Sequence, residues 1–206
     1  VDETLPGWRR AVAEKRDWYY CDNSYFDRGR QAYFRVTRNG LQATNILPPN
    51  YKRLENLGAK IKPWREGGEH VIVCEQSRDF MRLCGFGGGW LDLITEDLRR
   101  YTKRPLRIRR WNRDKGKMAE SLREDLRGAW ALVTHMSAAA NEALLQGVPV
   151  FLTGTCAATP MGEDDLSKIE QPFLPSNRED WAAGLAANQW TMEEIKSGRC
   201  WEAVKP

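Results

Sequence analysis

Histidine and long apolar runs are both scarce in this 206-residue chain. His70 and His135 are the only histidines, and no Cys-x-x-Cys pair occurs, so the usual ligand sets of structural zinc are missing. No apolar run approaches the roughly 20 residues that cross a bilayer, and residues 1–10 lack the basic-then-apolar order of a signal peptide. We therefore expect no bound metal, no membrane partner and a cytoplasmic location.

Paired cysteines and repeats are also missing. The five cysteines are odd in number and widely scattered, which is typical of reduced intracellular thiols: Cys21, Cys74, Cys84, Cys156 and Cys200. The chain has no internal repeat and no low-complexity tract. Its 41% hydrophobic content suffices for a buried core, and 32 basic against 28 acidic residues leave a net charge of only +4. This composition excludes a disordered chain.

The basic residues that are present crowd into one stretch. Eight of them lie within fifteen residues: Arg99, Arg100, Lys103, Arg104, Arg107, Arg109, Arg110 and Arg113. Two interpretations remain open, a solvated helix end with a strand edge, or a surface that binds the phosphate of a nucleotide or nucleic acid.

The order of apolar segments predicts two regions. Residues 1–42 have the pattern of a helix followed by strands at 17–22 and 32–38. Residues 43–69 are rich in proline and glycine, which indicates a long surface connection. We expect residues 1–69 to form a small N-terminal lobe that includes this connecting loop. If the protein transfers a chemical group, this lobe would hold the molecule that accepts it.

Residues 70–206 alternate between strand and helix patterns. Strands are predicted at 70–74, 106–109, 129–134 and 148–152, with helices between them at 90–101, 118–126 and 137–146. The glycine-rich residues 85–89 follow a helical segment, so they indicate a turn and not a dinucleotide motif. The predicted fold class is α/β, a Rossmann-like parallel sheet with flanking helices, and helices that start at Ser176 and Thr191 complete this domain.

Ligands of open α/β sheets bind at the carboxyl ends of the strands, so the residues there are the candidate site. They include Glu75, Gln76 and Ser77 after the first strand and Arg109 at the end of the second. After the third strand, His135 and Ser137 precede an alanine-rich helix start, which indicates a phosphate site. A plain helix cap at Ser137 is the alternative. In the loops, Trp64 and Trp111 stand beside arginines, a pattern that fits either stacking on a base or sugar, or packing on the core.

The segment ALVTHMSAAANEALLQGVPVF resembles the donor-binding half of GT-B glycosyltransferases of the capsule-polysaccharide type. The segments YCDNSYF, YFRVTRN, VIVCEQS and RPLRIR are similar to those of small glycosyltransferase-like proteins of bacteriophages, and the resemblance spans most of residues 17–204. It implies a GT-B donor-domain fold and transfer of a sugar from a nucleotide-sugar donor to an acceptor hydroxyl without a metal or another cofactor.

The resemblance also implies roles for the candidate residues. His135 and Ser137 would hold the donor phosphates beside the small Ala138, Glu142 the ribose, and Arg109 the departing diphosphate. Gln76 and Ser77 would line the same pocket. Asp22 or Glu75 would be the general base on the acceptor, and either could instead be a structural acceptor of hydrogen bonds.

One departure from the family concerns size, because residues 1–69 are too few for a second Rossmann-like domain. The second half of the active-site cleft would then come from a partner protein or from a second copy of the chain in a homodimer. The acceptor would be a surface glycan or phage DNA that carries a hydroxymethylated pyrimidine. The alternative function is a catalytically inactive relative that binds a nucleotide or nucleic acid.

Overall fold

The computed structural model of the chain describes residues 6–26, 33–43, 46–83, 85–86, 88–110 and 122–206. It divides the chain into two compact units. Unit 1 comprises residues 1–59 and 180–206, and unit 2 comprises residues 60–179.

Unit 2 contains a four-stranded parallel sheet, as the alternating pattern predicted. The strands lie in the order β4, β3, β5, β6, with bounds β3 His70–Cys74, β4 Leu106–Arg109, β5 Ala129–Thr134 and β6 Val150–Leu152. All five residues of β3 are buried, which is expected of a central strand covered on both faces. The fold is thus mixed α/β, with a parallel sheet of a type compatible with a Rossmann-like domain.

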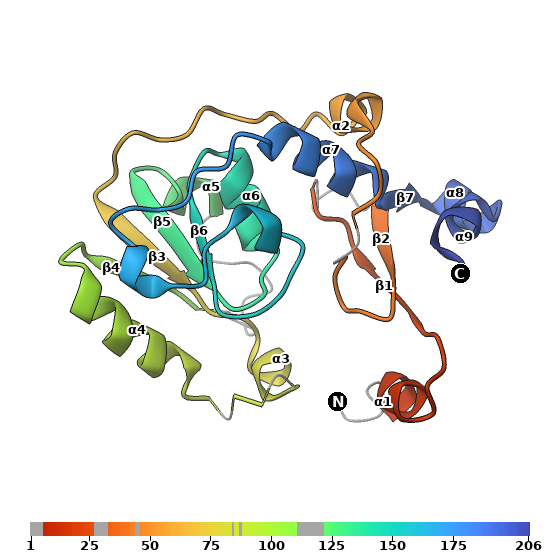
Figure 1. The fold of residues 1–206 in the computed structure, drawn as a ribbon, viewed down its shortest axis with the longest axis horizontal. Coiled ribbons are helices and arrows are strands. Elements are labelled where there is room, and N and C mark those ends of the chain that lie inside the picture. Colours follow the sequence, from red (N-terminus) through yellow and green to blue (C-terminus); the bar gives the residue numbers. More distant parts are fainter. Residues whose placement is uncertain (1–5, 27–32, 44–45, 84, 87, 111–121) are drawn as a thin grey trace. The chain divides into compact units, whose positions relative to one another are not determined.

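Helices cover both faces of this sheet (Figure 1). One face packs against α4, where Trp90 and Leu98 meet Val71 and Val73 of β3. The other face carries α5 and α6. The helices of unit 2 are α3 Arg78–Leu83, α4 Trp90–Tyr101, α5 Leu122–Asp125 and α6 Ala139–Leu145, with short 3-10 turns at Thr159–Met161 and Leu166–Lys168. Met118, predicted at the start of the helix before β5, lies outside the described residues.

Unit 1 contains a three-stranded antiparallel sheet in the order β1, β2, β7. Its strands are β1 Tyr19–Asn23, β2 Tyr33–Arg38 and β7 Gln189–Thr191, and its helices are α1 Pro6–Ala13, α2 Tyr51–Asn56, α8 Met192–Lys196 and α9 Arg199–Val204. Helix α7, Arg178–Ala187, starts at the end of unit 2 and runs into unit 1. The helix predicted to start at Thr191 is α8, and Thr191 and Glu194 form a capping box at its start.

This division differs from the boundary expected between residues 69 and 70. The C-terminal segment belongs to unit 1, because β7 pairs with β2 and because Arg53 of α2 forms an ion pair with Glu194. The three-residue β7 is too short to show a strand period in the sequence. The proline-rich connection also contains a helix, α2, whose N-cap Asn50 accepts a hydrogen bond from the Arg53 amide at 2.9 Å.

Candidate functional site

The strand order of unit 2 places a topological switch point between β3 and β5. The chain moves from β3 outward to β4, and then returns past β3 to continue with β5 and β6 on the other side. Ligands of open α/β sheets bind outside the carboxyl ends of the strands at such a point. Residues 75–77, 135–137 and 153–154 follow the strands on either side of it.

Side-chain hydrogen bonds hold the two strand ends at the switch point together. The backbone amide of Met136 donates to Oε1 of Gln76 at 2.9 Å. The hydroxyl of Thr134 donates to the carbonyl oxygen of Cys74 at 2.7 Å. Gln76, which we expected in the ligand pocket, therefore supports the loop that carries His135.

His135 follows β5 directly and is 7% exposed. Its Nδ1 lies 3.0 Å from Oγ1 of Thr153, and Phe86 packs edge-on against its ring with 4.9 Å between the ring centroids. Burial lowers the pKa of His135 below the ordinary value of 6.5, and a backbone hydrogen bond with Thr153 opposes part of that shift. The imidazole is therefore uncharged at neutral pH and carries one N–H donor.

Trp90 is a part of this cluster that sequence reasoning missed. It is the first residue of α4 and only 3% exposed, and its Nε1 donates to Oγ1 of Thr153 at 2.8 Å. In the sequence, the spacing of Trp90 indicates only a helix. A buried tryptophan usually finds an acceptor for its N–H, and Thr153 supplies it from the end of β6.

The hydroxyls of the two candidate serines accept backbone hydrogen bonds beside helical segments. Ser137 Oγ accepts a hydrogen bond from the Ala139 amide at 3.2 Å, and Ser77 Oγ accepts one from the Phe80 amide at 3.3 Å. Ser137 also bonds to the thiol of Cys74, whose pKa is raised to about 11, chiefly by burial. Ser137 thus bonds to the backbone from one residue before Ala138, the N-cap position of α6.

The first turn of α6 presents two polar side chains of different character. Glu142 is partly buried, and its carboxylate makes no hydrogen bond or ion pair with a described residue. Asn141 is 1% exposed, and its Nδ2 has no hydrogen-bond partner there either. Ala138 stands at the N-cap position of α6 and is partly exposed.

Arg109 and Glu75 lie at the ends of β4 and β3, where the backbone amide of Glu75 donates to the Arg109 carbonyl at 3.0 Å. The guanidinium of Arg109 forms an ion pair with Asp125 of α5. Part of its charge is therefore compensated within unit 2. The Glu75 carboxylate makes no hydrogen bond or ion pair with any residue that the structure describes.

Asp22 belongs to unit 1 and not to the sheet that carries the other candidates. It lies on β1, where its carboxylate forms an ion pair with the buried Arg35 and accepts a hydrogen bond from the Tyr20 hydroxyl at 3.3 Å. These contacts correspond to the structural alternative for Asp22.

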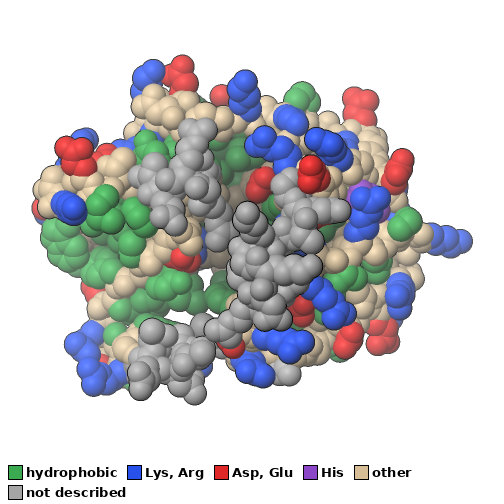
Figure 2. Space-filling view, turned by 180° about the vertical axis from the view of Figure 1, so that it is seen from behind, with side chains coloured by type: hydrophobic (Ala, Val, Ile, Leu, Met, Phe, Trp, Pro, Cys, Tyr) green, Lys and Arg blue, Asp and Glu red, His purple; other side chains and the backbone are tan. Residues whose placement is uncertain are grey.

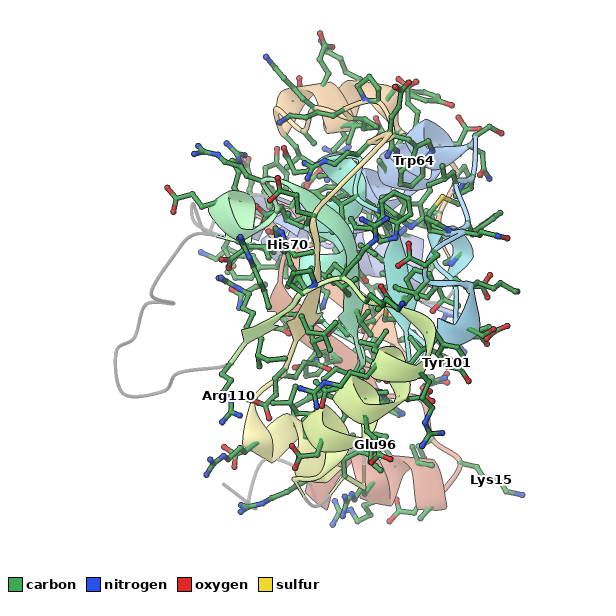
Figure 3. The ribbon with its side chains drawn as sticks, turned by 90° about the vertical axis from the view of Figure 1, so that its left-hand side faces the viewer. Lys15, Trp64, His70, Glu96, Tyr101 and Arg110 are labelled. Carbon is green, nitrogen blue, oxygen red and sulfur yellow. The ribbon has the colours of Figure 1, made fainter. Side chains whose placement is uncertain are left out.

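The basic stretch is partly neutralised by neighbouring carboxylates. Arg100 pairs with Glu96 at 3.1 Å, and Arg104 pairs with Glu170 at 3.0 Å. The face shown in Figure 2 has Lys and Arg interspersed with Asp and Glu, and Figure 3 shows Arg110 projecting outward at the end of β4. Arg113 lies outside the described residues, as does Trp111.

Trp64 packs within unit 2. Its Nε1 donates to the Pro175 carbonyl at 3.2 Å, and the guanidinium of Arg178 lies 3.8 Å from the centroid of its ring. One face of the indole is thus covered by Arg178, which favours the packing interpretation of this tryptophan.

The described residues show neither a metal site nor a membrane-spanning helix. They contain no group of three or more His, Cys, Asp or Glu side chains placed to hold a metal ion. Among their helices, none combines the length and the apolar character that a membrane crossing requires.

The two histidines should make the stability of the protein depend on pH. Burial also lowers the pKa of His70, which is labelled in Figure 3, with a further contribution from Arg107. Its Nε2 lies 3.2 Å from the Asp125 carbonyl. The unfolded chain exposes both imidazoles, so it binds protons at a higher pH than the folded chain does. Their contribution to the free energy of unfolding is therefore complete above pH 6.5 and is lost as the pH falls through the lowered pKa values.

Urea unfolding between about pH 8 and pH 5 would measure this effect. A His70→Gln, His135→Gln double variant keeps an amide donor near each Nε2 position and removes the titration. We expect its free energy of unfolding to change less with pH than that of the wild type. If the free energy of unfolding changed equally with pH in the wild type and the double variant below pH 6.5, the pH dependence would not come from these two histidines.

Comparison with known proteins finds no matching family model, no matching curated protein and no matching solved structure. Function is therefore inferred from the residues of the site.

Proposed function

We propose that unit 2 binds the nucleotide part of a nucleotide-sugar and that the protein is a metal-independent glycosyltransferase. The observation that carries the proposal is the position of His135. This buried, uncharged imidazole stands at the carboxyl end of β5, beside the switch point of a parallel sheet. The likeness of residues 131–151 to a GT-B donor half supports the same ligand.

In this proposal His135 donates a hydrogen bond to a phosphate oxygen of the donor. Glu142 accepts from the ribose hydroxyls, because its carboxylate is otherwise unengaged in the described part of the chain. Arg109 contributes positive charge near the diphosphate, though its ion pair with Asp125 compensates part of that charge.

The proposed general base is Glu75. The Asp22 carboxylate is engaged by the guanidinium of Arg35, whereas the Glu75 carboxylate makes no hydrogen bond or ion pair with a described residue and is therefore available to an acceptor hydroxyl. Glu75 takes a proton from the acceptor hydroxyl as the sugar bond forms and the nucleotide diphosphate leaves. The acceptor is a glycan or a hydroxymethylated pyrimidine of DNA.

One observation favours a second candidate, a protein that binds the nucleotide without transfer. GT-B enzymes have two Rossmann-like domains, whereas unit 1 contains a three-stranded antiparallel sheet among its described residues. Release or transfer of radiolabelled sugar from a panel of donors distinguishes the two candidates. Binding without release of sugar would favour the second.

The first test is a thermal-shift screen against UDP, GDP, CMP, ADP and their sugar conjugates. A ligand present at a hundredfold excess over its Kd stabilises the folded state by about 2.7 kcal/mol. We expect a shift with one nucleotide family, abolished in His135→Ala and partly kept in His135→Gln, which retains a donor. His70→Gln is the matched control and should keep the shift. No shift with any nucleotide would overturn the proposal.

A further inference from the structure

Two arginines of β4 point to the same face of the parallel sheet in unit 2. Arg107 is in register with Ile72 of β3, and because side chains of a strand alternate between the faces, both share a face with His70. Nε2 of His70 lies 3.2 Å from the carbonyl oxygen of Asp125 in α5, so α5 lies on this face. Arg109, two residues further along β4, pairs with the Asp125 carboxylate. The arginines of β4 therefore point to the side of the sheet that carries α5.

Four exposed arginines lie on these two elements or directly after them. Arg107 lies on β4, and Arg110 follows the strand, where Figure 3 shows its side chain projecting outward. Arg123 lies in α5, and Arg127 is in the turn after it, where its amide donates to the Glu124 carbonyl at 2.9 Å. None of the four guanidinium groups makes a hydrogen bond or an ion pair with a residue that the structure describes. We call this set the β4–α5 surface: Arg107, Arg110, Arg123 and Arg127.

Positive charge on the β4–α5 surface exceeds the negative charge beside it. Residues 106–110 and 122–127 contain five arginines but only two carboxylates, and the carboxylate of Asp125 is occupied by Arg109. The excess is felt within the sheet, because burial and then the charge of Arg107 lower the pKa of His70. The surface therefore carries a net positive charge.

The chemistry of the β4–α5 surface fits phosphate. All four of its cations are arginines, whose planar guanidinium groups donate two parallel hydrogen bonds to one phosphate. A nucleic acid offers such a surface a continuous row of phosphates, with about one charge per 1.7 Å of duplex axis. We propose that the β4–α5 surface binds the phosphate backbone of a nucleic acid. This goes beyond the proposed function and does not rest on it, because phosphate contacts need no sugar donor.

The test is binding of a fluorescein-labelled DNA duplex to the full chain, without any nucleotide-sugar. Fluorescence anisotropy would measure the affinity over a range of NaCl concentrations. The logarithm of the affinity falls with the logarithm of the salt concentration with a slope of about 0.9 for each phosphate contact. With four contacts, we expect the affinity to fall about 150-fold between about 50 and 200 mM NaCl. Absence of binding at the lower salt concentration would overturn the proposal.

Two double variants would each remove half of the contacts. One combines Arg107→Ala with Arg110→Ala, and the other combines Arg123→Ala with Arg127→Ala. The affinity of each should be lower than that of the wild type at low salt, and it should fall only about 12-fold over the same salt range. All four side chains are exposed, so both variants should unfold at the urea concentration that unfolds the wild type.

Arg100→Ala is the matched control, because Arg100 is an exposed arginine that pairs with Glu96 on its own helix at 3.1 Å. It should keep the salt dependence of the wild type. Double variants that behave like this control would contradict the proposal, and self-association of the Arg107→Ala, Arg110→Ala variant would then assign these arginines to protection of the sheet edge. Polyglutamate that displaced the DNA as readily as unlabelled DNA does would overturn the assignment to phosphate. The thermal-shift test of the proposed function is independent, since it depends on His135.

Discussion

Replacing Gly147 with alanine is expected to lower the free energy of unfolding of unit 2 by about 3 kcal/mol, through backbone strain and a collision together. Gly147 ends α6 with a φ of +77°, and its amide donates to the Leu144 carbonyl at 3.1 Å. A left-handed conformation costs an L-residue about 1–2 kcal/mol. A Cβ here would also meet the Pro63 carbonyl oxygen more closely than real Cβ atoms approach any atom.

The collision matters because the segment before β3 is tied to this helix end. The amide of Arg65 donates to the Gly147 carbonyl at 2.9 Å, and the amide of Lys62 donates to the Leu145 carbonyl at the same distance. Moving Pro63 away from a new methyl group would strain both bonds. We therefore expect faster hydrogen exchange in residues 139–152 as well as lower stability.

Gly58→Ala is the matched control for strain alone. Gly58 has a φ of +66°, and a Cβ there meets nothing within 4 Å. We expect this variant to lose only the strain energy, about 1 kcal/mol. Urea unfolding would compare the free energies of unfolding of the Gly147→Ala and Gly58→Ala variants. Hydrogen exchange would show which residues lose protection. If Gly147→Ala were no less stable than Gly58→Ala, the contact with Pro63 would have no energetic weight.

Replacing Gly154 with alanine should displace the ring of His135. The new Cβ would lie 2.5 Å from Cε1, 2.8 Å from Nδ1 and 2.9 Å from Nε2 of that ring. Forced movement in a packed site typically costs about 1–3 kcal/mol. The ring would also leave the Thr153 hydroxyl, so we expect nucleotide stabilisation to be lost as in His135→Ala.

Gly67→Ala provides the control in the same unit, because a Cβ at Gly67 meets nothing within 4 Å. Its stability should stay within about 0.5 kcal/mol of the wild type, as for most surface substitutions. Thermal unfolding of both variants without nucleotide measures the loss of stability. The same measurement with the nucleotide found in the screen measures the loss of nucleotide stabilisation. A Gly154→Ala variant with full stability and full nucleotide stabilisation would show that the ring position is not required.

Local pattern in the sequence was sufficient for most elements of unit 2. Apolar runs predicted β3, β4 and β5 at the residues where they occur, and the spacing of apolar residues predicted α4. The helix predicted at 137–146 corresponds to α6, and Gly147 just after it has the positive φ that glycine commonly adopts at a helix end. These features depend on side-chain periods and backbone preferences within a few residues, which a sequence displays directly.

The division into units could not be obtained in that way. Pairing of β7 with β2 joins residues more than 150 positions apart, and β7 has only three residues. Helix α2 was missed in a segment rich in proline and glycine, although its N-cap Asn50 is a local signal. The boundary follows from which distant segments pack together, and that choice leaves little trace in local composition.

For the candidate site, the sequence by itself determined which strand ends carry polar residues, and so it named His135, Gln76 and Ser137. The tertiary structure decided what each of them contacts. It brought Trp90 from the start of α4 and Thr153 from the end of β6 to one imidazole, and it placed Asp22 in the other unit. The physical reason is that hydrogen bonds and close packing form between segments distant in the chain, whereas periodicity reports only on neighbours.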